Sequence, residues 1–377
     1  MFFLLWFLGL GQTANLGQVQ TVVAVEAYQH AISQAQVHLN QLRTEYKCPG
    51  ISICVGTATQ VLWHELQGYA DLDTQSPLTT DHLFRIGSTS KALTSIGLGI
   101  LIEQGKLDLN APIQHYVPSF PKKKYPITLR QLAGHQAGIR DYDFAKGEYH
   151  NQRHFHSITE ALAIFQDSDL LFEPGTQYQY TTYGYTLLSA AMESAAQTDF
   201  LTFMQTAIFQ PLALKHTHAD DVTQPLNRVS FYGINRFSGA VEVLGPIDNS
   251  NKWAGGGFLS TSGDLVAFGS GLLRNALIQK ETRERLFTPQ SLTNGEATQY
   301  GIGWRSWQQT LPSGAKVRVA HHGGTAYGAM SMLVVFPDDD LVVALNTNLL
   351  NRDGWAFMKH AFTFADFFLQ ARSDTSP

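Results

Sequence analysis

The chain has 377 residues, with 26 Lys and Arg against 31 Asp and Glu, and a formal net charge of −5. Apolar residues make up 44% of the sequence and charged residues only 15%, which excludes a disordered chain. The mild acidity gives no basic surface for nucleic acid, so we expect no nucleic-acid partner. The two cysteines, Cys48 and Cys54, are too few to hold such a chain together. We expect both to be buried free thiols, with a disulfide after export as the alternative.

An apolar run over residues 2–10 is the one candidate targeting segment. It is far shorter than the roughly 20 residues that cross a bilayer, and its length suits the hydrophobic region of a signal peptide. No Lys or Arg occurs before Arg43, so the usual positive flank is missing. We interpret residues 1–16 as a signal or N-terminal segment and expect export, periplasmic or secreted. A truncated start or a buried N-terminal segment is the alternative, and no membrane span is expected elsewhere.

Hydrophobic periodicity predicts the elements of the first third of the chain. Over residues 25–42 apolar side chains recur at steps of three and four, which predicts an amphipathic helix packed on a sheet. Two strands are predicted next, over 50–55 and 61–69, with a turn between them. Residues 88–102 are helical in pattern and apolar nearly all round, as in a buried helix.

The remaining elements suggest a sheet built from both ends of the chain. The middle mixes short helical patterns with loops rich in Pro and Gly, and strand patterns return near the C-terminus. The predicted strands lie at 300–304, 316–322, 330–336 and 341–345, with a turn at 338–340 and an aromatic-rich helix at 357–369. We predict an α+β fold, an α/β sandwich whose antiparallel sheet is flanked by helices, with a helical subdomain inserted. The predicted divisions are 17–105 for the first part of the sheet domain, 106–246 for the helical subdomain, 247–372 for the rest of the sheet domain and 373–377 for a tail.

A serine and a lysine three residues apart open the predicted buried helix. Ser88 and Lys91 form a Ser-x-x-Lys motif, which puts a hydroxyl and an amine on one helix face. Two other matches begin at Ser119 and Ser313, but a proline interrupts the first and a predicted hairpin turn holds the second. The helix N-terminus favours charge on the Ser88 oxygen, and burial favours a neutral, basic Lys91. A helix N-cap is the alternative role for Ser88.

Two further polar residues have the right chemistry to join this pair. A tyrosine near Ser and Lys can relay a proton, and Tyr180 is the candidate. A polar residue at a strand edge can hold a substrate carboxylate, and strand alternation favours His322 over His321 for the cleft. With an unperturbed pKa of about 6.5, we expect His322 to be partly protonated near neutral pH. A core tyrosine and an ordinary edge histidine are the alternatives.

Several motifs occur in an order that resembles the serine beta-lactamase-related family. They are Phe84-Arg-Ile-Gly-Ser-Thr-Ser-Lys91, Thr128-Leu-Arg-Gln-Leu-Ala-Gly-His135, Phe172-Glu-Pro-Gly175, Trp253-Ala-Gly-Gly-Gly-Phe-Leu-Ser-Thr261 and His322-Gly-Gly324. The family groups class C beta-lactamases, D-aminopeptidases, DD-carboxypeptidases and related esterases. Other segments resemble its animal mitochondrial branch and the bacterial relatives of that branch: Gln67-Gly-Tyr-Ala-Asp71, Gly105-Lys-Leu-Asp-Leu109, His115-Tyr-Val-Pro118 and Tyr183-Gly-Tyr-Thr-Leu-Leu188. The resemblance covers roughly residues 45 to 350.

The resemblance implies a catalytic role for four residues. Ser88 would be the acylated nucleophile, Lys91 its proton acceptor and Tyr180 an assistant in proton transfer. His322 would begin the element where the family has Lys-Thr-Gly or His-x-Gly. The fold implied is the beta-lactamase/transpeptidase fold.

The resemblance also implies the substrate-binding groups. Gly323 and Gly324 would complete the strand element, and the oxyanion hole would be the backbone N–H groups of Ser88 and Thr325. Thr182 stands where class C beta-lactamases have an Asn whose amide holds the substrate side chain. Threonine lacks that amide, which puts antibiotic hydrolysis in doubt and leaves acyl transfer intact.

The expected function is therefore that of a serine hydrolase that forms an acyl-enzyme at Ser88 on a small peptide, amide or ester substrate. No metal or organic cofactor is expected, because the histidine pairs at 154/156 and 216/218 have no obvious third ligand. One alternative is a true beta-lactamase or DD-carboxypeptidase, and another is a non-catalytic scaffold protein with the same fold. The joint presence of Ser88, Lys91 and Tyr180 favours an enzyme.

Overall fold

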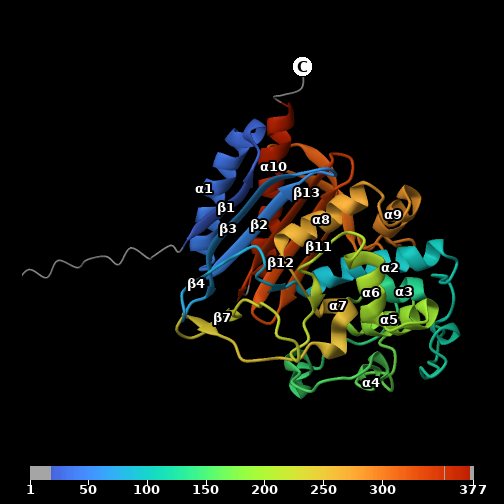
Figure 1. The fold of residues 1–377 in the computed structure, drawn as a ribbon. Coiled ribbons are helices and arrows are strands. Elements are labelled where there is room, and N and C mark those ends of the chain that lie inside the picture. Colours follow the sequence, from blue (N-terminus) through green and yellow to red (C-terminus); the bar gives the residue numbers. More distant parts are fainter. Residues whose placement is uncertain (1–17, 352, 374–377) are drawn as a thin grey trace, which may run out of the picture.

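An eight-stranded antiparallel sheet forms the central layer of the protein, whose computed structural model describes residues 18–351 and 353–373. The strand order is β1-β3-β2-β13-β12-β11-β10, with β4 paired to β3 (Figure 1). These strands are β1 (Val19–Ala24), β2 (Gly50–Gly56), β3 (Val61–Asp71), β4 (Ser76–Pro77), β10 (Arg305–Thr310), β11 (Lys316–Ala326), β12 (Ala329–Phe336) and β13 (Leu341–Thr347). The sheet unites both ends of the chain, so the predicted fold class is confirmed.

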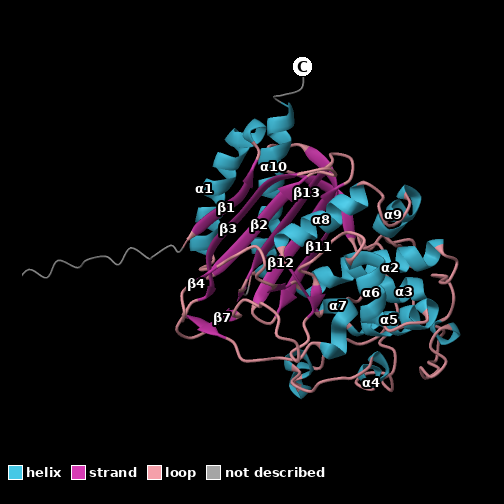
Figure 2. Cartoon of the chain, viewed as in Figure 1, coloured by secondary structure: helices cyan, strands magenta, loops and turns pink. Residues whose placement is uncertain are grey.

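Helices cover both faces of this sheet, as Figure 2 shows. Helices α1 (Gln29–Glu45) and α10 (Gly354–Ser373) pack together on one face, and α8 (Ser262–Leu273) packs on β2 and β13 on the other. Successive residues of β13 enter the two cores alternately: Val343 and Leu345 face α1 and α10, whereas Val342 and Ala344 face the opposite layer. Burial on both faces explains why the inner strands are nearly continuous apolar runs.

The second layer gathers further helices around α2 (Ser90–Glu103), which is buried along almost its whole length. Its members are α3 (Leu129–Ala133), α4 (Ile158–Leu162), α5 (Tyr183–Ala196), α6 (Phe200–Met204), α7 (Trp253–Gly256) and α9 (Lys280–Phe287). Short strands border this layer: β5 (Phe84–Arg85), β6 (His218–Ala219) and β9 (Phe258–Ser260) form one sheet, and β7 (Tyr232–Ile234), β8 (Val241–Val243) and β14 (Leu349–Leu350) form another. Helix α2 contacts α5, α7 and α9, so it is the axis of the layer.

Two sequence predictions need correction or addition. The strand predicted at 300–304 is wrong, because Gly303 has a φ of +79° and turns the chain before β10 begins at Arg305. A Cβ at Gly303 would lie 2.7 Å from the Lys91 carbonyl oxygen, so the glycine also allows close packing on α2. Strand β1 was not predicted, because it is an exposed edge strand without apolar alternation.

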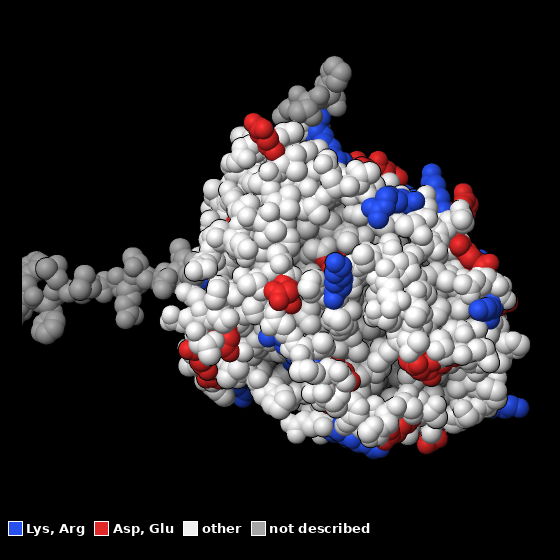
Figure 3. Space-filling view, viewed as in Figure 1, with Lys and Arg blue, Asp and Glu red and all other residues white. Residues whose placement is uncertain are grey.

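The other sequence expectations have mixed outcomes. The helix predicted over 25–42 lies at Gln29–Glu45, and Cys48 and Cys54 are buried free thiols as expected. The signal segment predicted at 1–16 lies outside the described residues, and so does the predicted tail at 373–377 apart from Ser373, where α10 ends. Among the described helices, none has both the length and the apolar character that crossing a membrane requires. On the face seen in Figure 3, basic and acidic residues are interspersed, with no continuous basic patch there.

A buried ion cluster fixes the start of the segment that leads into α2. The carboxylate of Asp220 is fully buried and accepts hydrogen bonds from Arg85 Nε (2.7 Å), Arg228 Nε (2.8 Å) and Asn249 Nδ2 (2.7 Å). Arg85 also donates to the carbonyl oxygen of Tyr327 at 2.8 Å, which ties β5 to the turn after β11. The cluster therefore joins β5, just before Gly87 and Ser88, to the turn after β11 and to the loops that hold Arg228 and Asn249.

We expect Asp220→Ala to lower the free energy of unfolding by about 3–5 kcal/mol, because it leaves the buried guanidinium of Arg85 and the half-buried one of Arg228 without their carboxylate. Asp221→Ala is the matched control, since Asp221 only caps a local turn through Thr223. Its expected cost is about 1 kcal/mol or less. Urea denaturation of both variants measures the difference, and equal losses would contradict a structural role for the cluster.

Candidate active site

Ser88 lies in a short 3-10 turn, Gly87–Thr89, between β5 and α2. Gly87 has a φ of +47°, and a Cβ there would lie 2.7 Å from the carbonyl oxygen and 3.0 Å from the nitrogen of Thr325 on β11. Only glycine allows this approach, which brings the backbones of Ser88 and Thr325 next to each other. That neighbourhood is what an oxyanion hole made of two backbone N–H groups requires.

The amine of Lys91 is buried beside the Ser88 hydroxyl. Lys91 Nζ lies 3.2 Å from Ser88 Oγ, 2.6 Å from the carbonyl oxygen of Gly255 and 3.4 Å from Thr182 Oγ1. No carboxylate of the described residues lies within ion-pair distance of it. Burial lowers the pKa of Lys91 to about 7; the charge of Asp141 partly opposes this decrease. A neutral amine of this kind can accept the proton of Ser88. The N-cap position of α2 is occupied by Thr89, not by Ser88.

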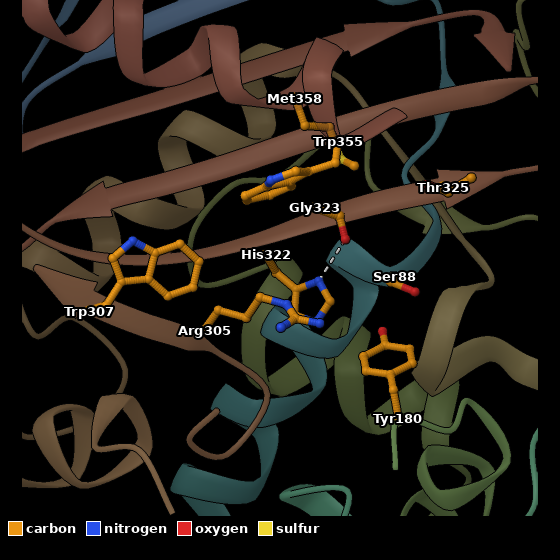
Figure 4. A pocket seen from close by; sticks show the side chains of 9 residues that line it. All are labelled: Ser88, Tyr180, Arg305, Trp307, His322, Gly323, Thr325, Trp355 and Met358. Atoms are coloured by element: carbon orange, nitrogen blue, oxygen red, sulfur yellow. Dashed lines mark hydrogen bonds between the residues drawn. The ribbon is translucent and has the colours of Figure 1, made fainter. Parts of the chain in front are cut away.

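Tyr180 completes a triad with these two residues. Its ring centroid lies 4.7 Å from Lys91 Nζ, and its hydroxyl points toward Ser88 (Figure 4). This hydroxyl is buried, and the Ser88 side chain is close enough to act on its pKa through a hydrogen bond. The ring packs against His135 with centroids 4.2 Å apart, which fixes its orientation. Burial raises the pKa of Tyr180, so the hydroxyl keeps its proton at rest and is able to relay one.

His322 faces the cleft, but its expected partial charge is wrong. Its Nδ1 donates to the carbonyl oxygen of Gly323 at 2.7 Å, and its Nε2 accepts from the Tyr300 hydroxyl at 2.9 Å. Burial, with repulsion from Lys91 and Arg305, holds the pKa of His322 well below its usual range. The imidazole is therefore neutral and cannot provide a cation for a substrate carboxylate.

Two cavities meet at Ser88, Tyr180 and Thr325. The first has a volume of about 470 Å³, and its other lining residues are Arg305, Trp307, His322, Gly323, Trp355 and Met358 (Figure 4). The second has a volume of about 320 Å³, and its lining includes Asp141, Tyr142, Tyr149, Thr182, Lys252 and Tyr327. The structure thus brings the predicted site residues to one cleft between the sheet and the helical layer.

Two predicted site residues line neither cavity: the fully buried Lys91, and Gly324. A Cβ on Gly324 would lie 1.8 Å from the carbonyl oxygen of Ile86, so its place is explained by close packing of β11 against the turn before Ser88. Gly255 has a similar role on the other side, where a Cβ would lie 2.6 Å from Thr182 Cγ2. Glycine at both positions lets the segments around Ser88 and Lys91 approach closely.

Three charged residues of the cleft were missed by the sequence reasoning. Arg305 begins β10, and its guanidinium lies 5.5 Å from the ring centroid of Tyr300. Asp141 accepts a hydrogen bond from the Thr182 backbone N–H at 2.9 Å, and Lys252 Nζ lies 5.1 Å from the ring centroids of Tyr142 and Tyr149. Lys252 directly precedes the motif that begins at Trp253, which was the available signal. Asp141 is adjacent to no recognised motif, and Arg305 follows a turn that was predicted to be a strand.

Comparison with known proteins decides the family. The profile of the family described as Beta-lactamase matches residues 35–362, most of the chain. The chain belongs to the beta-lactamase family.

Relatives of this beta-lactamase-family chain cover most of its length. The human serine beta-lactamase-like protein LACTB, mitochondrial, is 32% identical over 86% of this chain and 74% of its own length. A D-aminopeptidase of Gluconobacter oxydans is 25% identical over 84% of this chain and 59% of its own length. The crystal structure of FmtA from Staphylococcus aureus superposes with a TM-score of 0.75 at 20% identity, covering 93% of this chain and 92% of that one. The predicted resemblance and the beta-lactamase/transpeptidase-like fold are confirmed.

No metal site emerges from the described part of this beta-lactamase-family chain, since no group of three or more His, Cys, Asp or Glu there is placed to hold an ion. The reactive groups on view are the Ser88 hydroxyl, the Lys91 amine and the Tyr180 hydroxyl.

We expect reaction of a fluorophosphonate probe with the protein to accelerate as the pH rises through about 7. Below that value Lys91 is protonated and cannot accept the Ser88 proton; above it the amine is neutral, because burial lowers its pKa to about 7. Labelling rates between about pH 5.5 and pH 9 give the profile. Lys91→Met should abolish labelling, whereas Lys122→Met, in the interrupted Ser-x-x-Lys match, should leave the profile unchanged. A midpoint near 10 would contradict a buried neutral lysine.

Proposed function

We propose that the protein is a serine hydrolase that forms an acyl-enzyme at Ser88 and acts on peptide, amide or ester substrates. The observation that carries this proposal is the contact of 3.2 Å between the Ser88 hydroxyl and the buried amine of Lys91, at the junction of two cavities. A hydroxyl next to a base that is neutral near pH 7 is an activated nucleophile. Membership of a family with peptidase relatives supports the same class of reaction.

The first step forms the bond to the enzyme. Ser88 Oγ attacks the carbonyl carbon of the substrate while its proton passes to Lys91 Nζ. The carbonyl oxygen takes the negative charge and accepts hydrogen bonds from the backbone N–H groups of Ser88 and Thr325. Lys91 then carries a positive charge, which Asp141 offsets through the cleft.

The second step releases one half of the substrate. The oxyanion returns its electron pair to re-form the carbonyl, and the bond to the leaving nitrogen or oxygen breaks. The leaving atom takes a proton from the Tyr180 hydroxyl, which is replenished from the Lys91 ammonium. A water molecule then repeats the sequence in place of Ser88, which frees the acid product and restores the Ser88 hydroxyl.

The charged residues of the cleft suggest how the substrate is oriented. We place the leaving group in the first cavity, because the proton-donating Tyr180 is next to His322 there, with ring centroids 6.3 Å apart. Arg305 lines the same cavity, and no described carboxylate lies within ion-pair distance of it. Since His322 is neutral, Arg305 is the group able to hold a carboxylate on the leaving half.

The scaffold alternative is disfavoured by the cost of the site. Burying an amine such as Lys91 without a carboxylate partner destabilises the folded protein and serves no binding surface. Thr182 accepts a hydrogen bond from Lys91 and lacks the side-chain amide of class C beta-lactamases, which favours peptides or esters over antibiotics as substrates.

We expect Arg305→Gln to lower kcat/KM about 10- to 100-fold for a substrate whose leaving group has a free carboxylate, since a charged hydrogen bond is lost. The methyl ester of the same substrate should be hydrolysed equally by both proteins. Ser88→Ala should have no turnover on either substrate. Turnover that survives Ser88→Ala would contradict the proposed mechanism, and an equal loss on both substrates would contradict the role of Arg305.

A further inference from the structure

Two tryptophans and a methionine cover one end of the first cavity. Trp307 belongs to β10, whereas Trp355 and Met358 belong to the first turns of α10. The three side chains and Arg305 surround the part of the cavity away from Ser88 and Tyr180 (Figure 4). Trp355 is 41% exposed, while Phe357, two residues further along the helix, is fully buried. An indole left accessible at a cavity wall is a surface on which an apolar group can be buried.

Both indoles are held in place by the buried ring of His321. The centroid of His321 lies 4.4 Å from that of Trp307 and 5.8 Å from that of Trp355, and the two tryptophan centroids are 6.5 Å apart. Trp307 Nε1 also donates to Gln309 Oε1 at 3.0 Å. This anchoring fixes the aromatic wall before any ligand arrives, which reduces the entropy lost on binding.

The charge beside this wall decides which kind of ligand fits. Aromatic walls also bind quaternary ammonium groups, but Arg305 lies between Trp307 and His322 in the same cavity and would repel a cation (Figure 4). A ligand that combines a carboxylate with an apolar ring satisfies both Arg305 and the indoles. A volume of about 470 Å³ leaves room for such a group next to the scissile bond.

We propose that Trp307, Trp355 and Met358 form a specificity subsite that selects a leaving residue with a bulky apolar, preferably aromatic, side chain. This inference rests on the proposed function, because it assigns the first cavity to the leaving group. The carboxylate of that residue lies at Arg305, and its side chain packs against the indoles and the thioether.

The test compares substrates that share one acyl group and differ in the leaving residue: glycine, leucine, phenylalanine or tryptophan, each with a free carboxylate and in both configurations. We expect kcat/KM for phenylalanine to exceed that for glycine by about 10- to 100-fold in one configuration. Trp355→Ala should reduce the phenylalanine value to near that of glycine and change the glycine value little. Trp355→Phe should restore most of the preference, because it keeps an aromatic face.

Phe237→Ala is the matched control, since Phe237 is an exposed aromatic residue outside both cavities. It should leave every value unchanged. Equal kcat/KM values for glycine and phenylalanine, or an equal loss of both in Trp355→Ala, would overturn the subsite. The proposed function would still stand if turnover depended on Ser88. If no substrate were turned over in a Ser88-dependent way, the proposed function would be wrong. The subsite would then be tested by tryptophan fluorescence. Quenching by free phenylalanine that is absent with glycine and absent in Trp355→Ala would support it. Equal fluorescence with phenylalanine and with glycine would overturn it.

Discussion

The burial of the Lys91 amine beside the Ser88 hydroxyl is the constraint on which the rest of the site depends. An amine removed from water loses its hydration, and its neutral form is favoured as a result. The surrounding protein has to supply hydrogen-bond acceptors without supplying a close carboxylate, since a tight ion pair would restore the charge. The Gly255 carbonyl and the Thr182 hydroxyl are these acceptors. The carboxylate of Asp141 accepts a hydrogen bond from the Thr182 backbone N–H and forms no ion pair with the amine.

Close backbone approach is what makes this arrangement possible. Gly87 lets the nucleophile turn rest on β11, Gly324 lets β11 pass the carbonyl of Ile86, and Gly255 lets α7 rest on Thr182. At each position a Cβ would lie within 2.7 Å of another atom. Around Ser88 and Lys91, the sheet and the helical layer therefore pack together through backbone atoms, because the glycines have no side chains to keep them apart. Arg85 stabilises this packing, because it links the Asp220 carboxylate to the carbonyl oxygen of Tyr327 after β11.

Local sequence pattern was sufficient for the inner strands of the sheet and for the central motif, but not for the edge strands β1 and β10. The inner strands are buried on both faces and read as apolar runs, and Ser88 and Lys91 lie three residues apart before a buried helix, so their proximity followed from helix geometry. The roles assigned to them stay predictions. Residues 300–304 were wrongly predicted to be a strand, because their alternating Tyr, Ile and Trp are typical of one. The two glycines between these residues allow the turn that the structure shows.

The properties that could not be predicted depend on the tertiary environment. The low pKa of His322 results from its burial and from repulsion by Lys91 and Arg305, neither of which the local sequence reveals. Arg305 reaches the cleft only because β10 begins beside His321 on β11. A residue's position on a strand is readable from sequence, but its partners across the cleft are not.

Mapping the site of covalent attachment tests whether Ser88 is the nucleophile. The protein would be incubated with a fluorophosphonate, digested and analysed by mass spectrometry. We expect one adduct, on the peptide that contains Ser88, and no adduct in the Ser88→Ala protein. Attachment at Ser119 or Ser313, or undiminished labelling of the Ser88→Ala protein, would contradict it.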